Sequence, residues 1–267
     1  MFSSAFIKGH SHLKCEDYAI HGNKSGFLSD GCSGAVNSDI GSKILPFYAY
    51  EGLNHFLYTN NDTYNFKEYV FDLEKKVKRF IDVSDPLHSR SLVFDSIFSC
   101  TLGGIVQHSD KIHISLLGDG CIYYETVTGE ANIIIVRFGC NYPFYISYLF
   151  KQSNFDSWDS LRGNDIDILH YRLEGNNWVL IPQSIPNNTL YLTITHSIDD
   201  INLAAVFSDG PEQAEGMTTI EAIVELTNFK NFNTDFAWRR LKRFEENRSK
   251  QELYNHDDIS MVVYKRD

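Results

Sequence analysis

Short apolar runs rich in Val, Ile, Phe and Tyr recur through the chain, and they constrain its fold more than any other feature of the sequence. They predict strands at residues 26–29, 94–107, 111–118, 121–127, 132–138, 177–181, 190–195, 202–208 and 259–265. Most of these runs are joined by the turn-forming residues Gly, Asp or Asn, so neighbouring strands are expected to be antiparallel. The sequence therefore favours antiparallel sheets over the regular strand and helix alternation of a parallel sheet.

Helical spacing appears before and after this strand-rich middle. Apolar residues three or four apart predict one helix that begins near Ser38 and a second that follows Asn65. Later in the chain, Thr218 and Glu221 have capping-box spacing, and Thr234 precedes another amphipathic run. An early and a late pair of helices around antiparallel strands indicate an α+β fold in which helices cover the sheets.

The length of 267 residues falls at the upper end of the range for one domain, and 43% of the residues are hydrophobic, enough for one substantial core. We therefore expect a single domain over residues 1–267. The stretch at about 141–186 is the least regular, because it is polar and aromatic. It is expected to be either an excursion at the rim of the domain or a small insertion of structural importance.

The chain is acidic, with a formal net charge of −11. This charge opposes the polyanionic backbone of nucleic acids and the anionic surface of a membrane, so it argues against both as partners. An acidic excess also suits a site that gathers cations.

The cysteines are odd in number and form no CxxC pair: Cys15, Cys32, Cys100, Cys121 and Cys140. This pattern fits neither a disulfide framework nor a zinc site, and it favours a reducing compartment. The sequence also has no apolar signal core near its start and no run of ~20 apolar residues. We therefore expect a cytoplasmic protein.

Carboxylates follow several of the predicted strands. An apolar strand runs into Asp-Gly at Asp30-Gly31, Asp119-Gly120 and Asp209-Gly210, and the acidic pair Asp257-Asp258 precedes another strand. Each Asp-Gly by itself favours a hairpin turn. If the strand ending at Asp209 pairs antiparallel with the strand that follows Asp257, however, these two carboxylates lie at the same sheet edge. Crowded carboxylates are unfavourable unless a cation neutralises them or some become protonated.

The donor type indicates which cation such a cluster would hold. All-oxygen ligands favour Mg²⁺ or Mn²⁺ over zinc. Two such ions about 3.5–4 Å apart can share a carboxylate and lower the pKa of a bridging water. Asp30 is the best candidate for the shared carboxylate, because Gly31 allows a close approach of the backbone and offers its carbonyl as well.

Short motifs then follow one another in a fixed order between residues 9 and 264. They are Cys15-Glu16-Asp17, Ser29-Asp30-Gly31, Cys100-Thr101-Leu102, Gly118-Asp119-Gly120, Phe207-Ser208-Asp209-Gly210 and Asp257-Asp258-Ile259-Ser260. This series resembles that of the PP2C (PPM) metal-dependent Ser/Thr phosphatases, most closely the bacterial branch with an "SDGCSG" block. Each motif is weak alone, whereas the whole set in this order is specific and spans nearly the entire chain.

The resemblance implies an α-β-β-α sandwich, in which two antiparallel sheets lie between helix pairs. It also implies hydrolysis of phosphoserine or phosphothreonine in proteins by a water that bridges two Mg²⁺ or Mn²⁺ ions, without a covalent phosphoenzyme. The expected partners are a phosphoprotein substrate and a cognate Ser/Thr kinase.

The resemblance also assigns roles to individual residues. The implied metal ligands are Glu16, Asp30, Gly31 through its carbonyl, Asp119, Asp209 and Asp257. Asp30 would bridge the two metals, and Asp119 matches a position associated with a third, weaker metal. Asp17 would sit beside the site and orient the attacking water. Asp258 matches a position that is often Asn, and it is assigned a structural role.

Two positions depart from the family pattern. The phosphate-binding Arg of the family corresponds to His12, with Lys14 nearby but off register, so these two residues are the candidates for phosphate binding here. An imidazole cannot reproduce the bidentate fork of Arg. Cys32 stands where better-known members carry a His thought to protonate the leaving group, and a thiol with a pKa near 8.5 is a poor replacement. These departures favour an alternative function, a catalytically weak phosphoprotein-binding regulatory module on the same fold.

Other residues suggest further functions. His10 and His12 have the H-x-H spacing of some barrel metallohydrolases, but no repeated strand and helix alternation accompanies them. Cys32 would serve a cysteine phosphatase only with an Arg five residues later, where the chain has Asn37. One aromatic cluster fits either a docking surface or ordinary core: Tyr142, Phe144, Tyr145, Tyr148 and Phe150.

Overall fold

The computed structural model describes residues 1–60, 63–85, 91–139, 142–161, 166–182, 185 and 189–267. Cys140 lies outside these residues. Two antiparallel sheets form the centre of the molecule. One has seven strands in the order β1-β12-β11-β6-β7-β8-β9, and the other has five in the order β10-β5-β4-β3-β2.

The strands of the seven-stranded sheet are β1 (Phe2–Ile7), β6 (Gly120–Thr126), β7 (Ala131–Phe138), β8 (Ile166–Glu174), β9 (Asn177–Leu180), β11 (Ile201–Phe207) and β12 (Ile259–Lys265). Those of the five-stranded sheet are β2 (Asp17–His21), β3 (Ser25–Asp30), β4 (Leu102–His108), β5 (Lys111–Leu117) and β10 (Tyr191–Ser197). The helices are α1 (Ser38–Thr59), α2 (Phe66–Ser84), α3 (Ser91–Ile97), α4 (Gln152–Leu161), α5 (Thr219–Thr227) and α6 (Phe236–Ser249), with short 3₁₀ turns η2 (Ile146–Leu149) and η3 (Gly210–Gln213).

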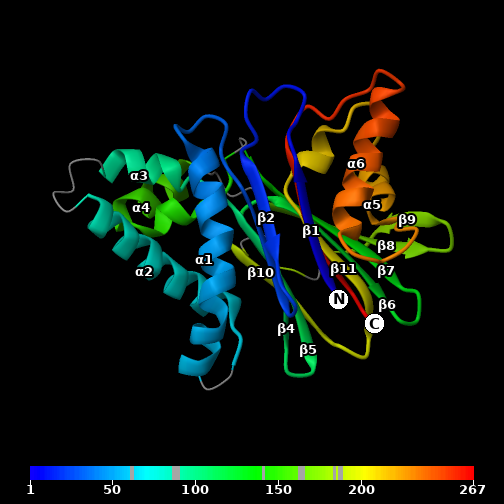
Figure 1. Ribbon diagram of the computed structural model, residues 1–267, viewed down its shortest axis with the longest axis horizontal. Helices are drawn as coiled ribbons and strands as arrows, with labels where there is room; N and C mark the ends of the chain where they lie inside the picture. Colours follow the sequence, from blue (N-terminus) through cyan, green and yellow to red (C-terminus); the bar gives the residue numbers. More distant parts are fainter. Residues whose placement is uncertain (61–62, 86–90, 140–141, 162–165, 183–184, 186–188) are drawn as a thin grey trace.

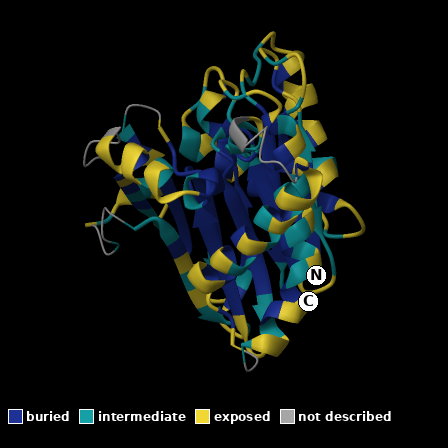
Figure 2. Ribbon diagram, turned by 90° about the vertical axis from the view of Figure 1, so that its left-hand side faces the viewer, coloured by how far each residue is buried: buried dark blue, intermediate teal, exposed yellow. Residues whose placement is uncertain are grey.

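Helices lie on both outer sides of the paired sheets. The helices α1 and α2 lie on the side of the five-stranded sheet, and α5 and α6 lie on the side of the seven-stranded sheet (Figure 1). This arrangement confirms the α-β-β-α sandwich expected from the sequence. Figure 2 shows that buried residues gather on the strands, whereas the outward surfaces of the helices are largely exposed.

Two apolar clusters hold these layers together. The larger one contains Phe27 and Val206, from the two sheets, together with Leu45 and Tyr69 from α1 and α2. The second joins the outer face of the seven-stranded sheet to α5 and α6. The sheet pair is thus packed on both faces and provides a rigid frame for the loops at its ends.

Local signals place the helix starts where the sequence predicted them. The side chain of Asn65 caps α2 by accepting a hydrogen bond from the backbone of Glu68 at 3.2 Å. The capping box ahead of α5 is confirmed: the backbone of Glu221 donates to the Thr218 hydroxyl at 3.2 Å, and the backbone of Thr218 donates to the Glu221 carboxylate at 2.7 Å. Each cap pairs backbone N–H groups that a helix start leaves without partners.

The predicted strand over 94–107 is wrong in its first part. Residues 91–97 form α3, and β4 begins only at Leu102. The ring of Phe80 in α2 meets those of Phe94 and Phe98 edge-on, with centroids 6.4 and 6.5 Å apart. A short apolar run does not distinguish a strand from a helix, and packing against α2 decided between them here.

The stretch at 141–186 contains regular structure over its described residues. It includes η2, α4, β8 and β9. The strand β8 pairs with β7 from Asn132 opposite Arg172 to Phe138 opposite Ile166, and β9 forms the edge of the seven-stranded sheet. In β8 the alternation of buried Ile166 and Ile168 with exposed Asp167 is the period of a half-buried strand.

Among the described residues, no helix is both long enough and apolar enough to cross a membrane.

Candidate functional site

The predicted carboxylates come together at one end of the sandwich. The strands β11 and β12 pair antiparallel with Phe207 opposite Met261, which confirms that Asp209 and Asp257 lie at the same sheet edge. In the other sheet, Asp17 lies opposite Asp30 where β2 pairs with β3. Asp119 lies in the tight turn through which the chain passes from β5 in one sheet to β6 in the other.

Asp30 is held by contacts of its backbone. Its amide donates to the Thr101 hydroxyl at 3.1 Å, and the Thr101 amide donates to the Asp30 carbonyl at 2.9 Å. The Gly31 amide donates to the Glu16 carbonyl at 3.1 Å, and a Cβ on Gly31 would lie 2.9 Å from the Ser38 carbonyl oxygen. A side chain at position 31 would therefore push the N-terminus of α1 away from the site.

The buried carboxylate of Asp258 ties the loop between β1 and β2 to the site. Its two oxygens accept hydrogen bonds from the amide of Gly9, at 2.6 Å, and from the amide of Glu16. A Cβ on Gly9 would lie 2.3 Å from the carbonyl carbon of Asp257, so the two chain segments are in direct contact. Figure 1 shows this loop and the segment before β12 beside one another at the same end of the molecule. These contacts agree with the structural role assigned to Asp258.

Burial and like charges raise the pKa values of the clustered carboxyl groups. Burial raises the pKa of Asp30 well above its ordinary value, and the charges of Asp17 and Asp209 add to the rise. Burial and the charge of Asp209 act in the same way on the pKa of Asp119. The pKa of Asp17 rises to about 8 and that of Asp209 to about 7, in both cases mainly through burial. At neutral pH these side chains cannot all carry a charge unless a cation lies among them.

The donor atoms fit a hard divalent cation. The oxygens Oδ2 of Asp17 and Oδ1 of Asp119 are buried and have no hydrogen-bond partner. The carboxyl groups of Asp17 and Asp209 each lie close enough to that of Asp30 to interact with it directly. In the described part of the chain, however, no three His, Cys, Asp or Glu side chains are arranged around a common point as the ligands of a metal ion are. The structure thus gathers oxygen donors of the right type without forming a closed coordination shell.

Glu16 lies beside the cluster with its side chain buried. Its Oε1 atom accepts a hydrogen bond from the Ser38 hydroxyl at 3.4 Å. This contact links a predicted metal ligand to the first residue of α1.

The candidate phosphate-binding residues contact carboxylates. His12 places Nε2 3.5 Å from Asp257 Oδ1 and Nδ1 3.1 Å from Asp258 Oδ1. Burial lowers the pKa of His12, but the hydrogen bond to Asp258 and the nearby carboxylate charges outweigh this effect and raise it overall. The ammonium of Lys14 pairs with Asp39 and lies 4.0 Å from Glu16. Both cations therefore lie at the edge of the carboxylate cluster.

Sequence reasoning missed one residue of the site, Tyr145. Its side chain lies beside Cys32, and burial, the Cys32 thiol and the charges of Asp119 and Asp30 raise its pKa. The other rings of this aromatic cluster pack mainly as core, since Phe144 is fully buried and meets Trp158 edge-on at 4.7 Å. The sequence contains no signal that separates Tyr145 from its aromatic neighbours.

The H-x-H spacing at residues 10 and 12 belongs to no barrel. The described strands form two antiparallel sheets rather than a ring of alternating strands and helices, and the His10 ring stacks on Tyr254 with centroids 4.2 Å apart.

Comparison with known proteins gives matches in structure only. No protein-family model matches the sequence. No curated protein matches it either. Among solved structures, a bacterial serine phosphatase is 11% identical, covers 100% of this chain and 97% of its own, and superposes with a TM-score of 0.53.

Two further solved structures give the same result. The serine/threonine phosphatase Stp1 from Staphylococcus aureus is 11% identical, with 100% of this chain and 96% of its own covered and a TM-score of 0.52. The PPM Ser-Thr phosphatase MsPP from Mycobacterium smegmatis is 13% identical, with 100% and 98% covered and a TM-score of 0.50. Identities this low establish the architecture alone. The chain has the α+β sandwich fold of bacterial PPM-type Ser/Thr phosphatases.

Proposed function

We propose that the chain is a metal-dependent protein phosphatase that hydrolyses phosphoserine and phosphothreonine in proteins. The observation that carries this proposal is the gathering of buried and half-buried carboxylates with raised pKa values at one end of the sandwich: Asp17, Asp30, Asp119, Asp209 and Asp257. Such crowding destabilises a fold, so a function that requires a cation accounts for it best. We propose one phosphatase domain over residues 1–267, acting in the cytoplasm on a phosphoprotein supplied by a Ser/Thr kinase.

The cofactor in this proposal is Mg²⁺ or Mn²⁺. The proposed ligands of two ions are Glu16, Asp30, the Gly31 carbonyl, Asp209 and Asp257, with Asp119 at a third and weaker position. When bound, these ions supply positive charge that stabilises the phosphoryl group in the transition state, and they lower the pKa of the attacking water.

Asp17 is proposed to orient the attacking water. It lies opposite Asp30 in the β2–β3 pair, and its Oδ2 atom is buried without a partner. One carboxylate oxygen is thus free to accept a hydrogen bond from the water. We propose Asp17 as the general base and Asp30 as the ligand shared by the two metal ions.

His12 and Lys14 are proposed to attract the phosphoryl group of the substrate. Both lie on the loop that Asp258 fixes through Gly9 and Glu16. The raised pKa of His12 favours the imidazolium form, which carries the positive charge that a phosphate dianion needs. An imidazolium provides charge without the bidentate geometry of Arg, so substrate binding is expected to be weaker than with a guanidinium.

A second candidate function is a catalytically weak module that binds phosphoproteins and regulates them. It is favoured by the short distances from His12 to Asp257 and Asp258, because an imidazolium that neutralises these carboxylates has less charge to offer a phosphate. Cys32, which stands where a proton-donating imidazole would be expected, favours it as well. This candidate predicts retained binding of a phosphopeptide with very slow turnover.

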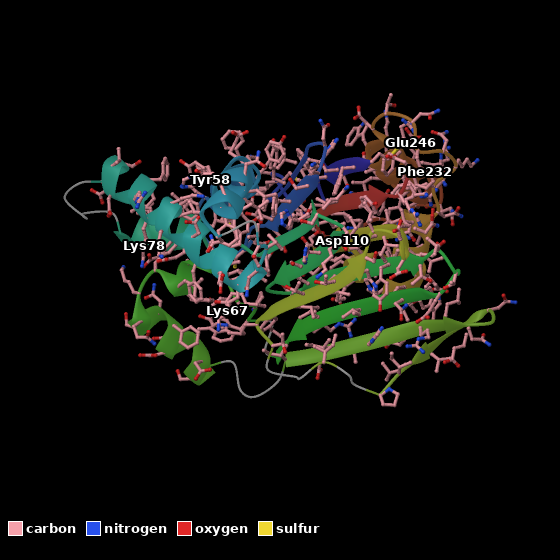
Figure 3. The ribbon with its side chains drawn as sticks, turned by 90° about the horizontal axis from the view of Figure 1, so that it is seen from below. Tyr58, Lys67, Lys78, Asp110, Phe232 and Glu246 are labelled. Carbon is pink, nitrogen blue, oxygen red and sulfur yellow. The ribbon has the colours of Figure 1, made fainter. Side chains whose placement is uncertain are left out.

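Hydrolysis of a phosphothreonine peptide with Mn²⁺, with and without EDTA, separates the two candidates. The enzyme proposal predicts turnover that disappears in EDTA and in the Asp209→Asn variant. The matched control is Asp110→Asn, an exposed Asp in the turn between β4 and β5 (labelled in Figure 3). This turn lies at the opposite end of β5 from Asp119. Turnover that survives complete metal removal contradicts the enzyme proposal. Peptide binding with turnover at background supports the regulatory module.

A further inference from the structure

A small pocket surrounded by cations lies at the start of α6, away from the carboxylates. Its volume is about 60 Å³, and it is lined by Lys230, Arg239, Arg240 and Arg243 together with Phe229 and Phe236. We refer to it as the basic pocket. Four cations around one small space are unexpected in a chain of net charge −11. The volume has room for a single small anion, such as one phosphoryl group.

Arg240 gives this pocket a buried donor without an acceptor. Its side chain is 9% exposed, and its Nη2 atom lies 3.1 Å from Glu225 Oε1. Its Nε atom is buried and has no hydrogen-bond partner. An unpartnered N–H on a buried guanidinium is costly, and an oxyanion in the pocket would add negative charge beside this guanidinium.

The other cations leave their positive charges uncompensated within the described part of the chain. Arg239 donates to the Thr234 hydroxyl and the Asn231 side-chain oxygen, each at 2.7 Å, and both acceptors are neutral. These bonds fix its guanidinium without cancelling its charge. Lys230 and Arg243 are exposed and form no ion pair with any described residue. The basic pocket therefore carries positive charge that an anionic partner would neutralise.

An aromatic groove of about 710 Å³ lies beside the basic pocket. Phe229 lines both, and the groove continues over Phe232, Tyr123 and Trp178. Figure 1 shows α5, α6, β8 and β9 on the same side of the molecule. Figure 3 shows Phe232 on that side, away from Lys67 and Lys78 of α2. An anionic anchor continuous with an aromatic groove fits a peptide that carries a phosphoryl group next to apolar side chains.

The two binding features lie far from the carboxylates. The groove is lined by Asn202 and Leu203 at the start of β11, whereas Asp209 follows the end of that strand. Seven residues of strand span roughly 23 Å. A docked segment would therefore leave the carboxylate end accessible, and about seven extended residues would connect the two places.

We propose that the basic pocket and the aromatic groove together dock a phosphorylated, apolar-flanked segment of a partner protein, separately from the carboxylate cluster. The choice of a phosphoprotein as partner rests on the proposed function. The description of the binding surface rests only on the charges and shape of the pocket and groove. In a phosphatase, such docking would select substrates that carry a second phosphorylated residue at a distance from the one that is hydrolysed.

Fluorescence anisotropy with a labelled peptide tests this proposal. The probe is a fluorescein-labelled peptide with a central phosphoserine flanked by Leu and Phe, added to the full chain carrying Asp30→Asn in EDTA, so that hydrolysis is prevented. We expect binding that weakens roughly 10-fold in Arg243→Gln, the loss of one charge-assisted contact. The matched control is Lys242→Gln, which removes a charge from the same helix. Lys242 does not line the pocket, and its ammonium lies 3.9 Å from the Glu246 carboxylate. It should leave the affinity unchanged.

Two further arms identify what is recognised. Trp178→Ala should weaken peptide binding. Inorganic phosphate should still compete with the peptide as it does in the unsubstituted groove, because phosphate needs only the basic pocket. The unphosphorylated peptide should bind at least 10-fold more weakly than the phosphopeptide. Phosphate binding without peptide binding, or equal binding of both peptides, overturns the docking proposal.

The test also separates this proposal from the proposed enzyme activity. Hydrolysis of p-nitrophenyl phosphate by the wild-type chain with Mn²⁺ should be unchanged by Arg243→Gln. Peptide binding that is lost in Asp209→Asn and retained in Arg243→Gln would place the peptide at the carboxylates and overturn docking. Docking without any hydrolysis would contradict the enzyme and leave the docking surface supported.

Discussion

The carboxylate cluster and the basic pocket lie at opposite ends of the seven-stranded sheet, and they gather charge in different ways. The cluster combines side chains from segments far apart in the sequence, and it buries charges of one sign. The basic pocket draws on one loop and one helix, and Lys230 and Arg243 stay exposed. Burying like charges costs stability, whereas solvent screens exposed ones. Charging all the carboxyl groups of the cluster at neutral pH is therefore costly, whereas the exposed cations of the basic pocket carry their charges at little cost.

The largest effect is expected from Asp30→Asn, which removes the carboxyl group that interacts with both Asp17 and Asp209. Turnover with Mn²⁺ should fall by roughly 1,000-fold, because the proposed shared ligand is lost. Without metal, the same variant should unfold at a higher temperature than the wild type, since repulsion among the carboxylates decreases. Thermal unfolding in EDTA measures this effect, with Asp110→Asn as the control. A lower unfolding temperature in EDTA would contradict the strain assigned to the cluster.

The next effect concerns the pH dependence of stability without metal. The folded-state pKa of Asp17 is about 8 and that of Asp209 is about 7, both above the ordinary value of 3.8. At a pH between the ordinary and the raised pKa, the folded state therefore binds more protons than the unfolded state. The free energy of unfolding in EDTA should therefore fall as the pH rises from about 4 to 8. Denaturant titrations at several pH values measure it. In Mn²⁺ the fall should be reduced or reversed, and a flat profile in EDTA would show that the cluster is not strained.

A smaller effect is expected from Arg248→Met at the end of α6. The buried Arg248 guanidinium donates to the carbonyl oxygens of Glu215 and Tyr254, and Tyr254 lies three residues before Asp257. Removing this donor should lower the free energy of unfolding by about 2 kcal/mol, because the Glu215 carbonyl loses its donor and the Tyr254 carbonyl keeps only the Glu215 amide. It should also weaken Mn²⁺ binding several-fold. Lys250→Met, at an exposed position two residues later, is the control and should change neither quantity.

The smallest effect is expected from Thr218→Ala, which breaks the capping box of α5. The free energy of unfolding should fall by about 1 kcal/mol. Mn²⁺ binding should stay unchanged, because α5 contributes none of the proposed ligands. Chemical denaturation and metal titration of the same preparation compare the two quantities. A change in metal affinity as large as the change in stability would show that the start of α5 and the carboxylate cluster are coupled.

The parts of the fold that were predictable depend on local chemistry. The caps at Asn65 and Thr218 involve residues within one helical turn, so the sequence alone located them. The position of Asp209 and Asp257 at one sheet edge was predictable, because the apolar runs that form β11 and β12 pair antiparallel. By contrast, the sequence predicts a strand where α3 forms. The helix depends on packing against Phe80, which is distant in the sequence.

The parts of the site that were not predictable depend on contacts between distant segments. The sequence singled out His12 as the position of a phosphate ligand, but its contacts with Asp257 and Asp258 arise only from the folded loop. Tyr145 reaches Cys32 from a segment more than a hundred residues away, and no spacing rule connects the two. The cations of the basic pocket are visible in the sequence as a basic run in α6, yet their convergence with Lys230 is not.

Calorimetric titration of Mn²⁺ into the metal-free protein tests the central claim most directly. If the cluster is a metal centre, the wild-type chain binds at least two equivalents of Mn²⁺ and releases protons, because carboxyl groups with raised pKa values must ionise to coordinate the ion. Asp30→Asn should abolish the tighter binding, whereas Asp110→Asn should retain it. No measurable binding by the wild type, or equal binding by Asp30→Asn, would contradict the claim that this end of the sandwich is built to hold divalent cations.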